Sequence, residues 1–278
     1  VLLLGCHSLL WALDPLRQTP EGGVTLVCPS PEDRQRLAAQ VDLLEPERQP
    51  QLVDGLEALP SMQIFDWIGG RLGTADLLDM NWDALVQSLT VHSTDHTGLR
   101  LLINCADVAL NGSLAEADLD SAHNLLQLNL LALTMLSSAA AVRFGLAGRG
   151  AIINIGSVVA LLPERFNAIY SASKAYVLSL SQSLHSELSG TGVQVQVVLP
   201  GVTRTEIFER SGSSLAQIPP SMVMEVDELV DAALRGFDQG ELVTIPSLPD
   251  SNEWQALTQA RLQLAPNLSH NHPAARYH

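Results

Sequence analysis

Short apolar runs alternate with longer amphipathic stretches along most of this 278-residue chain. The runs carry many β-branched residues and are followed by glycine, proline or a short polar residue, which predicts buried parallel strands. These runs are Val1–Leu4, Val24–Cys28, Met62–Phe65, Leu99–Ile103, Ala151–Ile155, Val193–Leu199 and Leu242–Ile245. Stretches with a helical repeat lie between them, at Pro31–Val41, Thr74–His92, Asp118–Leu146, Ala168–Ser189 and Val226–Phe237. This alternation predicts an α/β fold with a single doubly wound parallel sheet, of expected strand order 3-2-1-4-5-6-7.

The alternation continues without a break, so we expect one domain over residues 1–264. Residues 45–59 are polar and contain prolines, which predicts a surface connection between strands. A loop-rich insert at residues 203–225 follows the sixth predicted strand, and its apolar side chains suit a lid over an apolar or amphipathic small molecule. Residues 265–278 are expected to form a disordered tail.

Charge and cysteine content narrow the classes of partner. The net charge of −15 argues against binding to nucleic acid or to an anionic membrane, since both need basic patches. Residues 125–142 are uncharged, but polar side chains interrupt them, so we expect a buried interface helix rather than a membrane span. The three cysteines are too few for a disulfide framework and favour a reducing, cytoplasmic setting. His92 and His96 have a metal-like spacing, but we expect solvated histidines and no metal site.

The chemistry of the chain is concentrated between the fifth predicted strand and the helix that follows. Ser157 stands at the carboxyl end of that strand, and Tyr170 and Lys174 lie one helical turn apart on one face. A free tyrosine titrates near pH ~10, and a nearby ammonium favours the phenolate, so Lys174 is expected to lower the pKa of Tyr170. Ser157 could donate a hydrogen bond to a carbonyl oxygen. Together they suit proton transfer to or from a ketone or an alcohol.

At these residues the sequence resembles the short-chain dehydrogenase/reductase family, most closely from Leu99 to Thr205. The resemblance implies that Ser157, Tyr170 and Lys174 form the catalytic core. It also implies that a helical asparagine upstream, here Asn129, disturbs its helix and holds a water that relays protons to the lysine.

Two further motifs of the family have counterparts in this chain. The Asn-Asn-Ala-Gly motif is matched incompletely by Asn104-Cys105-Ala106-Asp107. The Pro-Gly-x-Val-x-Thr motif resembles Pro200–Thr205, where Thr203 replaces the usual valine. The resemblance implies that these segments help to hold NAD or NADP, through Asn104, Ala106, Pro200, Gly201, Val202 and Thr205 in addition to Tyr170 and Lys174.

The glycine-rich turn that would hold the dinucleotide phosphates differs from the family pattern. Of Gly-x-x-x-Gly-x-Gly only Gly5 is present, and Leu9 and Trp11 stand where glycines let the backbone approach the pyrophosphate. Asp66, after the third predicted strand, matches a residue that binds the adenine amino group in the family, although a helix cap is an alternative. The preference between NAD and NADP is not encoded in a recognisable residue.

Three functions remain open from the sequence. The first is hydride transfer between NAD(P) and a carbonyl/alcohol pair. The second keeps the fold but runs cofactor-free proton chemistry, as a lyase, an isomerase or a dehalogenase-like enzyme. The third is a non-catalytic subunit. The helices at Asp118–Leu146 and Ala168–Ser189 are long and apolar enough to pair with copies of themselves, so a homodimer or homotetramer is expected in each case.

Overall fold

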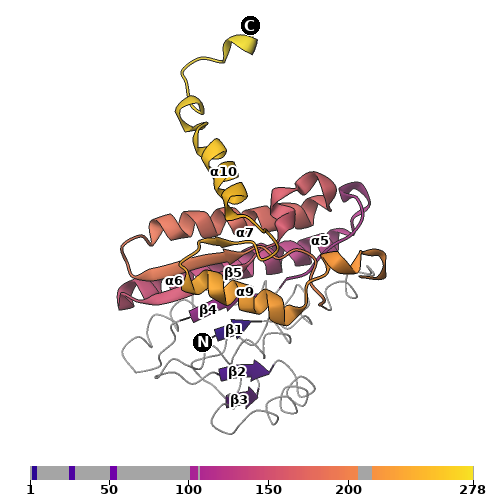
Figure 1. Cartoon of the computed structure of the whole chain (residues 1–278), viewed down its shortest axis with the longest axis vertical. Coiled ribbons are helices and arrows are strands. Elements are labelled where there is room, and N and C mark those ends of the chain that lie inside the picture. The colour runs from indigo at the N-terminus through magenta and orange to yellow at the C-terminus, as the bar shows by residue number, and fades with distance from the viewer. Residues whose placement is uncertain are drawn as a thin grey trace. The chain divides into compact units, whose positions relative to one another are not determined.

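The computed structural model describes residues 101–105, 107–205 and 215–277, together with the backbone of three short strands nearer the amino terminus (Figure 1). The chain divides into two compact units, Val1–Pro246 and Ser247–His278. The first unit contains the sheet and the predicted catalytic residues, and the second contains one helix and two 3-10 turns. The single domain predicted over residues 1–264 stays a prediction.

The sheet is parallel throughout, as the pattern of apolar runs predicts. Five strands pair in the order β1-β4-β5-β6-β7, and two more pair as β2-β3. They are β1 (Leu2–Leu4), β2 (Thr25–Cys28), β3 (Gln51–Asp54), β4 (Leu101–Asn104), β5 (Gly150–Ile155), β6 (Val193–Val198) and β7 (Val243–Thr244). Within each group the order agrees with the predicted 3-2-1-4-5-6-7. A hydrogen-bonded ladder between β1 and β2 is absent from the described strands.

The segment 45–59 differs from the sequence prediction. β3 lies at Gln51–Asp54, inside the segment 45–59 that was predicted to be a surface connection. Its Leu52 and Val53 pair in register with the apolar residues of β2, so tertiary pairing outweighs the polar and proline-rich flanks that suggested a loop. Met62–Phe65, the predicted strand, lies outside the described residues, as does the predicted helix Thr74–His92.

The predicted helices of the described region are present within a few residues of their predicted ends. A long helix consists of α5 (Leu119–Leu126), a π-helical segment η6 (Gln127–Ala132) and α6 (Leu133–Ala147). The other helices of the first unit are α7 (Ala168–Glu187) and α9 (Val226–Asp238). Single 3-10 turns occupy Leu114–Glu116, Val158–Leu161, Pro163–Arg165, Leu215–Gln217 and Pro220–Met222.

The second unit contains a helix that the sequence pattern did not predict. This helix, α10 (Ser251–Leu262), buries none of its residues, so it lacks the apolar stripe by which the other helices were recognised. Its start is set by Asp250, whose carboxylate accepts a hydrogen bond from the Asn252 amide at 2.9 Å. The 3-10 turns Ala265–Asn267 and Ala275–Tyr277 follow it, in the segment predicted to be a disordered tail.

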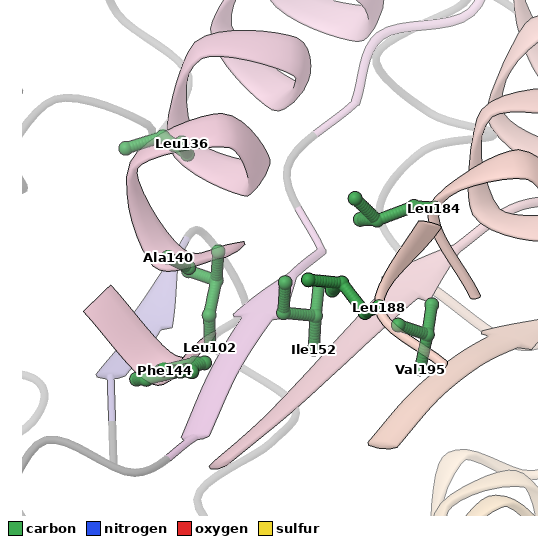
Figure 2. Close-up of a cluster of buried hydrophobic side chains, with 8 residues drawn as sticks. All are labelled: Leu102, Leu136, Ala140, Phe144, Ile152, Leu184, Leu188 and Val195. Carbon is green, nitrogen blue, oxygen red and sulfur yellow. The ribbon is translucent and has the colours of Figure 1, made fainter. Parts of the chain in front are cut away.

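Helices cover both faces of the central strands. On one face Leu102, Ile152 and Val195 lie in register across β4, β5 and β6. Side chains of α6 and α7 belong to the same buried cluster as this row (Figure 2); they are Leu136, Ala140, Phe144 and Leu184, with Leu188 just beyond α7. The opposite face carries Leu101, Ile103, Ala151, Ile153 and Val198, which pack against Leu229, Ala233 and Phe237 of α9. The alternation along β4 and β5 therefore buries both faces, as expected for a parallel sheet in a doubly wound fold.

The long helix Leu119–Ala147 is apolar enough and long enough to cross a membrane, with a window of mean hydropathy 1.7. Nearly half of that window is buried inside the protein, and Leu125 and Phe144 are fully buried. A core helix of a soluble protein passes the same length and composition test.

Gly156, between β5 and Ser157, is required by close packing. A Cβ atom at this position would lie 2.7 Å from Cδ2 of Leu199, a side chain that is itself fully buried. We expect Gly156→Ala to lower the free energy of unfolding by about 1–3 kcal/mol, the usual cost of overpacking. Chemical denaturation measures the difference.

The matched control is Gly145→Ala in α6, where a Cβ atom meets nothing within 4 Å. Because alanine is the better helix former, this variant should be as stable as the parent or more stable, by up to about 1 kcal/mol. A Gly156→Ala protein with the stability of Gly145→Ala would contradict the packing argument.

Candidate active site

Ser157 follows β5, where backbone hydrogen bonds join the residues after β5 to the carboxyl end of β6. The amide of Gly156 donates to the Val198 carbonyl at 2.8 Å, and the amide of Val158 donates to the Pro200 carbonyl at 3.0 Å. The Ser157 hydroxyl accepts a hydrogen bond from the Val159 amide at 3.3 Å and lies 3.5 Å from the Pro200 carbonyl. The side chain is partly exposed, so its hydroxyl can reach a ligand at this edge of the sheet.

Tyr170 and Lys174 project from the first turns of α7 toward the same edge. The helix begins at Asn167, whose side-chain oxygen accepts from the amides of Ile169 and Tyr170, each at 3.0 Å. The Lys174 ammonium lies 5.6 Å from the centre of the Tyr170 ring and donates to the Ile155 carbonyl at 3.2 Å. The structure therefore brings Ser157, Tyr170 and Lys174 together at the end of β5, as their spacing in the sequence predicts.

A carboxylate that the sequence reasoning did not assign to the site joins these residues. Oδ2 of Asp107 lies 2.7 Å from the Lys174 ammonium and accepts a hydrogen bond from the Tyr170 hydroxyl at 3.2 Å. Lys174 is 2% exposed and Asp107 is 20% exposed. The only signal in the sequence was that Asp107 ends the segment Asn104-Cys105-Ala106-Asp107, which matches its family motif incompletely.

The pKa of Tyr170 moves in the direction opposite to the sequence prediction. Burial and the negative charge of Asp107 raise it to about 12, from an ordinary value of 10.0. Lys174 and a hydrogen bond from Ser157 lower the pKa as expected, but these contributions are outweighed. Tyr170 is therefore a phenol, and a proton donor, throughout the neutral pH range.

Lys174 keeps its charge in spite of its burial. Burial alone lowers the pKa of the ammonium, but the carboxylate of Asp107 and the phenol of Tyr170 raise it above its ordinary value. A buried cation that stays charged next to Tyr170 favours any negative charge that develops on the phenol oxygen.

Asn129 lies inside the π-helical segment η6, which fits the expectation that this residue disturbs its helix. Its side chain makes a reciprocal pair of hydrogen bonds with Val108: Nδ2 donates to the carbonyl and Oδ1 accepts from the amide, both at 3.0 Å. Nδ2 also lies 3.3 Å from the Ser173 hydroxyl of α7. Asn129 thus holds the segment next to Asp107 against α7, and its predicted part in a proton relay to Lys174 stays a prediction.

The side chain of Asn104 lies in the core rather than at the edge of the site. It is 5% exposed, and its amide nitrogen donates to Oδ1 of Asn154 at 2.8 Å and to the Ser137 hydroxyl at 3.1 Å. Asn154, which the sequence analysis did not single out, donates in turn to the Ser181 hydroxyl at 3.0 Å. The sequence contains a signal for this pair, because Asn104 and Asn154 are polar residues at the same register position of two apolar strands.

The predicted cofactor segment Pro200–Thr205 lies directly after β6 and begins at the Ser157 site. A short parallel bridge joins it to Met224: the Met224 amide donates to the Val202 carbonyl, and the Arg204 amide donates to the Met224 carbonyl, both at 2.9 Å. The bridge holds the two ends of the predicted lid, residues 203–225, side by side. Gly201, Val202 and Thr205 are partly exposed, whereas Thr203 is 6% exposed.

Two of the three N–H donors of the Lys174 ammonium have acceptors among the described residues, at Asp107 and Ile155. Gly5, Asp66 and Ala106, the other predicted cofactor contacts, lie outside the described residues. No group of three metal-binding side chains occurs within the described ranges, and His92 and His96 lie outside them.

Comparison with solved structures gives close relatives over nearly the whole chain. The chain is 40% identical to a short-chain dehydrogenase from Sphingobium yanoikuyae in complex with NADPH, with a TM-score of 0.72 over 88% of this chain and 87% of that one. It is 37% identical to the bulky-bulky ketone specific alcohol dehydrogenase from Comamonas testosteroni, with a TM-score of 0.67 over 88% of this chain and 85% of that one.

Curated relatives match a smaller part. The ketoacyl reductase HetN of Nostoc sp. is 33% identical over 44% of this chain and 43% of its own length. The 3-oxoacyl-[acyl-carrier-protein] reductase FabG of Vibrio cholerae is 26% identical over 60% of this chain and 70% of its own length. The chain thus spans less than half of HetN and about two thirds of FabG.

The family profile described as short chain dehydrogenase matches residues 74–216, which is just over half of the chain. This segment includes β4 to β6, the long helix and α7, and with them the four predicted catalytic residues. Together with the 40% identity over nearly the full length, it establishes that the chain belongs to the short-chain dehydrogenase family.

Proposed function

We propose that this protein is an NAD(P)-dependent oxidoreductase that transfers a hydride between the nicotinamide and a carbonyl/alcohol pair. The observation that carries the proposal is the convergence of Ser157, Tyr170 and a charged, buried Lys174 at the carboxyl edge of the sheet. The NADPH bound to the solved relative from Sphingobium yanoikuyae supports the choice of cofactor.

Ser157, Tyr170 and Lys174 each have a separate role in the proposed carbonyl reduction. Ser157 donates a hydrogen bond to the carbonyl oxygen, and the Tyr170 hydroxyl gives that oxygen its proton. Lys174 contributes its remaining donor to the ribose, and its charge stabilises the phenolate that Tyr170 leaves behind. The bound nicotinamide supplies the hydride that the carbonyl carbon receives. In alcohol oxidation the same proton returns to Tyr170.

The substrate we propose is a ketone with bulky apolar substituents. One solved relative is described as specific for bulky-bulky ketones, and that enzyme is aligned with nearly all of this chain. The predicted lid supports an apolar substrate, since its described part exposes 61% of Met222. Cofactor-free chemistry and a purely structural role are not favoured, because these relatives are named as reductases and dehydrogenases.

Titration calorimetry of the purified protein with NAD⁺, NADH, NADP⁺ and NADPH tests the proposal. Micromolar binding of at least one dinucleotide, followed by turnover of a bulky ketone, is the expected result. If none of the four binds at high concentration, hydride transfer is excluded, and the site must work without a dinucleotide.

Location and assembly are also proposals. A cytoplasmic location is supported by the low cysteine content of the chain. Self-association is supported by an apolar groove of about 350 Å³, lined by His123, Leu126, Gln127, Leu130, Leu131, Thr134 and Tyr176. Leu126 and Leu131 are 43% and 37% exposed in the single chain, so a second copy would remove apolar surface from water.

Tyr170→Phe removes the proposed proton donor and leaves the ring in place. We expect the rate of carbonyl reduction at saturating ketone to fall by about 10²–10⁴-fold, the usual contribution of general acid catalysis. Dinucleotide binding by calorimetry should stay within a few-fold. The control is Tyr277→Phe in the second unit, whose side chain is 69% exposed and whose variant should turn over normally. Full activity of Tyr170→Phe would remove Tyr170 from the mechanism.

The double variant Leu126→Glu/Leu131→Glu tests the proposed interface. Two carboxylates in an apolar contact between copies are costly to desolvate, so the variant should sediment as a monomer of about 29.9 kDa. Leu268→Glu, at a residue that is 73% exposed in the second unit, should keep the mass of the parent. A double variant with the same mass as the parent would place the interface elsewhere.

A further inference from the structure

Asp107 occupies the centre of the proton-transfer site. One of its oxygen atoms, Oδ2, contacts both the Lys174 ammonium at 2.7 Å and the Tyr170 hydroxyl at 3.2 Å. A glycine at this position, as in the family motif, has no side chain that could make either contact. Ser157, Tyr170 and Lys174 are all present, so the carboxylate adds to the catalytic set without replacing a member of it.

The segment that carries Asp107 is held in place by its neighbours. The next residue, Val108, has both of its backbone polar groups bound by Asn129 at 3.0 Å, and Asn129 is itself 2% exposed. The same asparagine contacts Ser173, whose hydroxyl donates to the Tyr170 carbonyl at 2.7 Å. The carboxylate therefore sits between two braced elements, and its contacts with α7 do not depend on a mobile surface side chain.

We propose that Asp107 is a positioning residue of the reaction: its carboxylate holds the Tyr170 hydroxyl and the Lys174 ammonium together and keeps the proton on Tyr170. The proposal rests on the proposed hydride transfer for its consequence in catalysis. Carbonyl reduction needs Tyr170 in its phenol form, and alcohol oxidation needs the phenolate. Asp107 thus extends the pH range of carbonyl reduction to more alkaline pH, and it restricts alcohol oxidation to alkaline pH.

The charges around Tyr170 and Lys174 support the proposed role of Asp107. Among the described residues, the groups that act on Tyr170 are Lys174, Asp107 and Ser157, and those that act on Lys174 are Asp107, Tyr170 and Cys105. Lys174 and Ser157 favour the phenolate, whereas Asp107 and burial oppose it. Removal of the carboxylate therefore leaves Lys174 as the charge beside the phenol, and the proton of Tyr170 should leave at lower pH.

The test is a titration of the cofactor-free protein labelled with ¹³Cζ-tyrosine and followed by NMR. The chain has three tyrosines, so Tyr170→Phe identifies the Tyr170 signal by its loss. In the parent, this signal should keep its phenol position up to the highest pH at which the protein stays folded. In Asp107→Asn, which retains the shape of the side chain and an acceptor for Lys174, it should titrate at least about one pH unit lower. Asp238→Asn, which removes an exposed carboxylate at the end of α9, should match the parent.

Lys174→Met separates electrostatic control from loosening of the site. The charge that favours the phenolate is lost in this variant, so its Tyr170 signal should stay in the phenol position. If the two substitutions merely open the site to water, both should titrate near the ordinary value of 10.0. If Asp107→Asn does not fold by circular dichroism, Asp107→Ser removes the same charge with a smaller side chain. An unchanged Tyr170 signal in the folded Asp107 variant overturns the proposal, as does a downward shift in both variants.

Activity provides a second readout. In the Asp107 variant the alkaline limit of ketone reduction and the pH at which alcohol oxidation reaches its plateau should both move down by about one unit. A lower rate at every pH with unmoved limits would show a structural role only and would contradict the proposal. Failure of every dinucleotide to support turnover would overturn the proposed function. The NMR titration would still show whether Asp107 keeps the proton on Tyr170.

Discussion

The buried ammonium of Lys174 is the constraint on which the site depends. At 2% exposure it has lost its water, and a buried cation is stable only when it is paired and hydrogen-bonded. Asp107 supplies the charge, and the Ile155 carbonyl at the end of β5 supplies a second acceptor. These two contacts fix the start of α7 against the carboxyl end of β5 and against the segment after β4. Tyr170, one turn earlier on α7, is placed by the same contacts.

A second layer of buried polar groups lies beneath this edge of the sheet. Asn104 and Asn154 pair across β4 and β5 and continue into α6 and α7 through Ser137 and Ser181. Buried polar groups cost free energy unless they are hydrogen-bonded, so a shift in strand register would leave amides unpaired. This pairing thus disfavours alternative registers of β4 against β5. The same register fixes where β5 ends relative to β4, and therefore the position of Gly156 and Ser157, which follow β5.

The strands and helices that carry the site could be read from the sequence because each has a clear periodicity or a capping residue. α7 was predicted nearly to its ends, and Asn167 caps it where the pattern begins. The strand at Gln51–Asp54 was taken for part of a surface connection because pairing with β2, rather than its own composition, makes it a strand. α10 was missed because it buries no residue and therefore shows no apolar stripe. The two failures therefore have different causes: strand pairing outweighs the local pattern at β3, whereas α10 has no buried face that could produce a pattern.

In the candidate site, the sequence predicts the positions of the side chains but not the pKa of Tyr170. Sequence spacing was sufficient to place Ser157, Tyr170 and Lys174 together, because a strand end and a helix turn have fixed geometries. It was not sufficient to predict the direction in which the pKa of Tyr170 moves, since that direction is decided by burial and by a residue 63 positions away. All three residues that resemble the family's catalytic core are present, and Asp107 adds a negative charge beside two of them. Sequence spacing therefore predicts which side chains meet, whereas burial and neighbouring charges decide the pKa of the phenol.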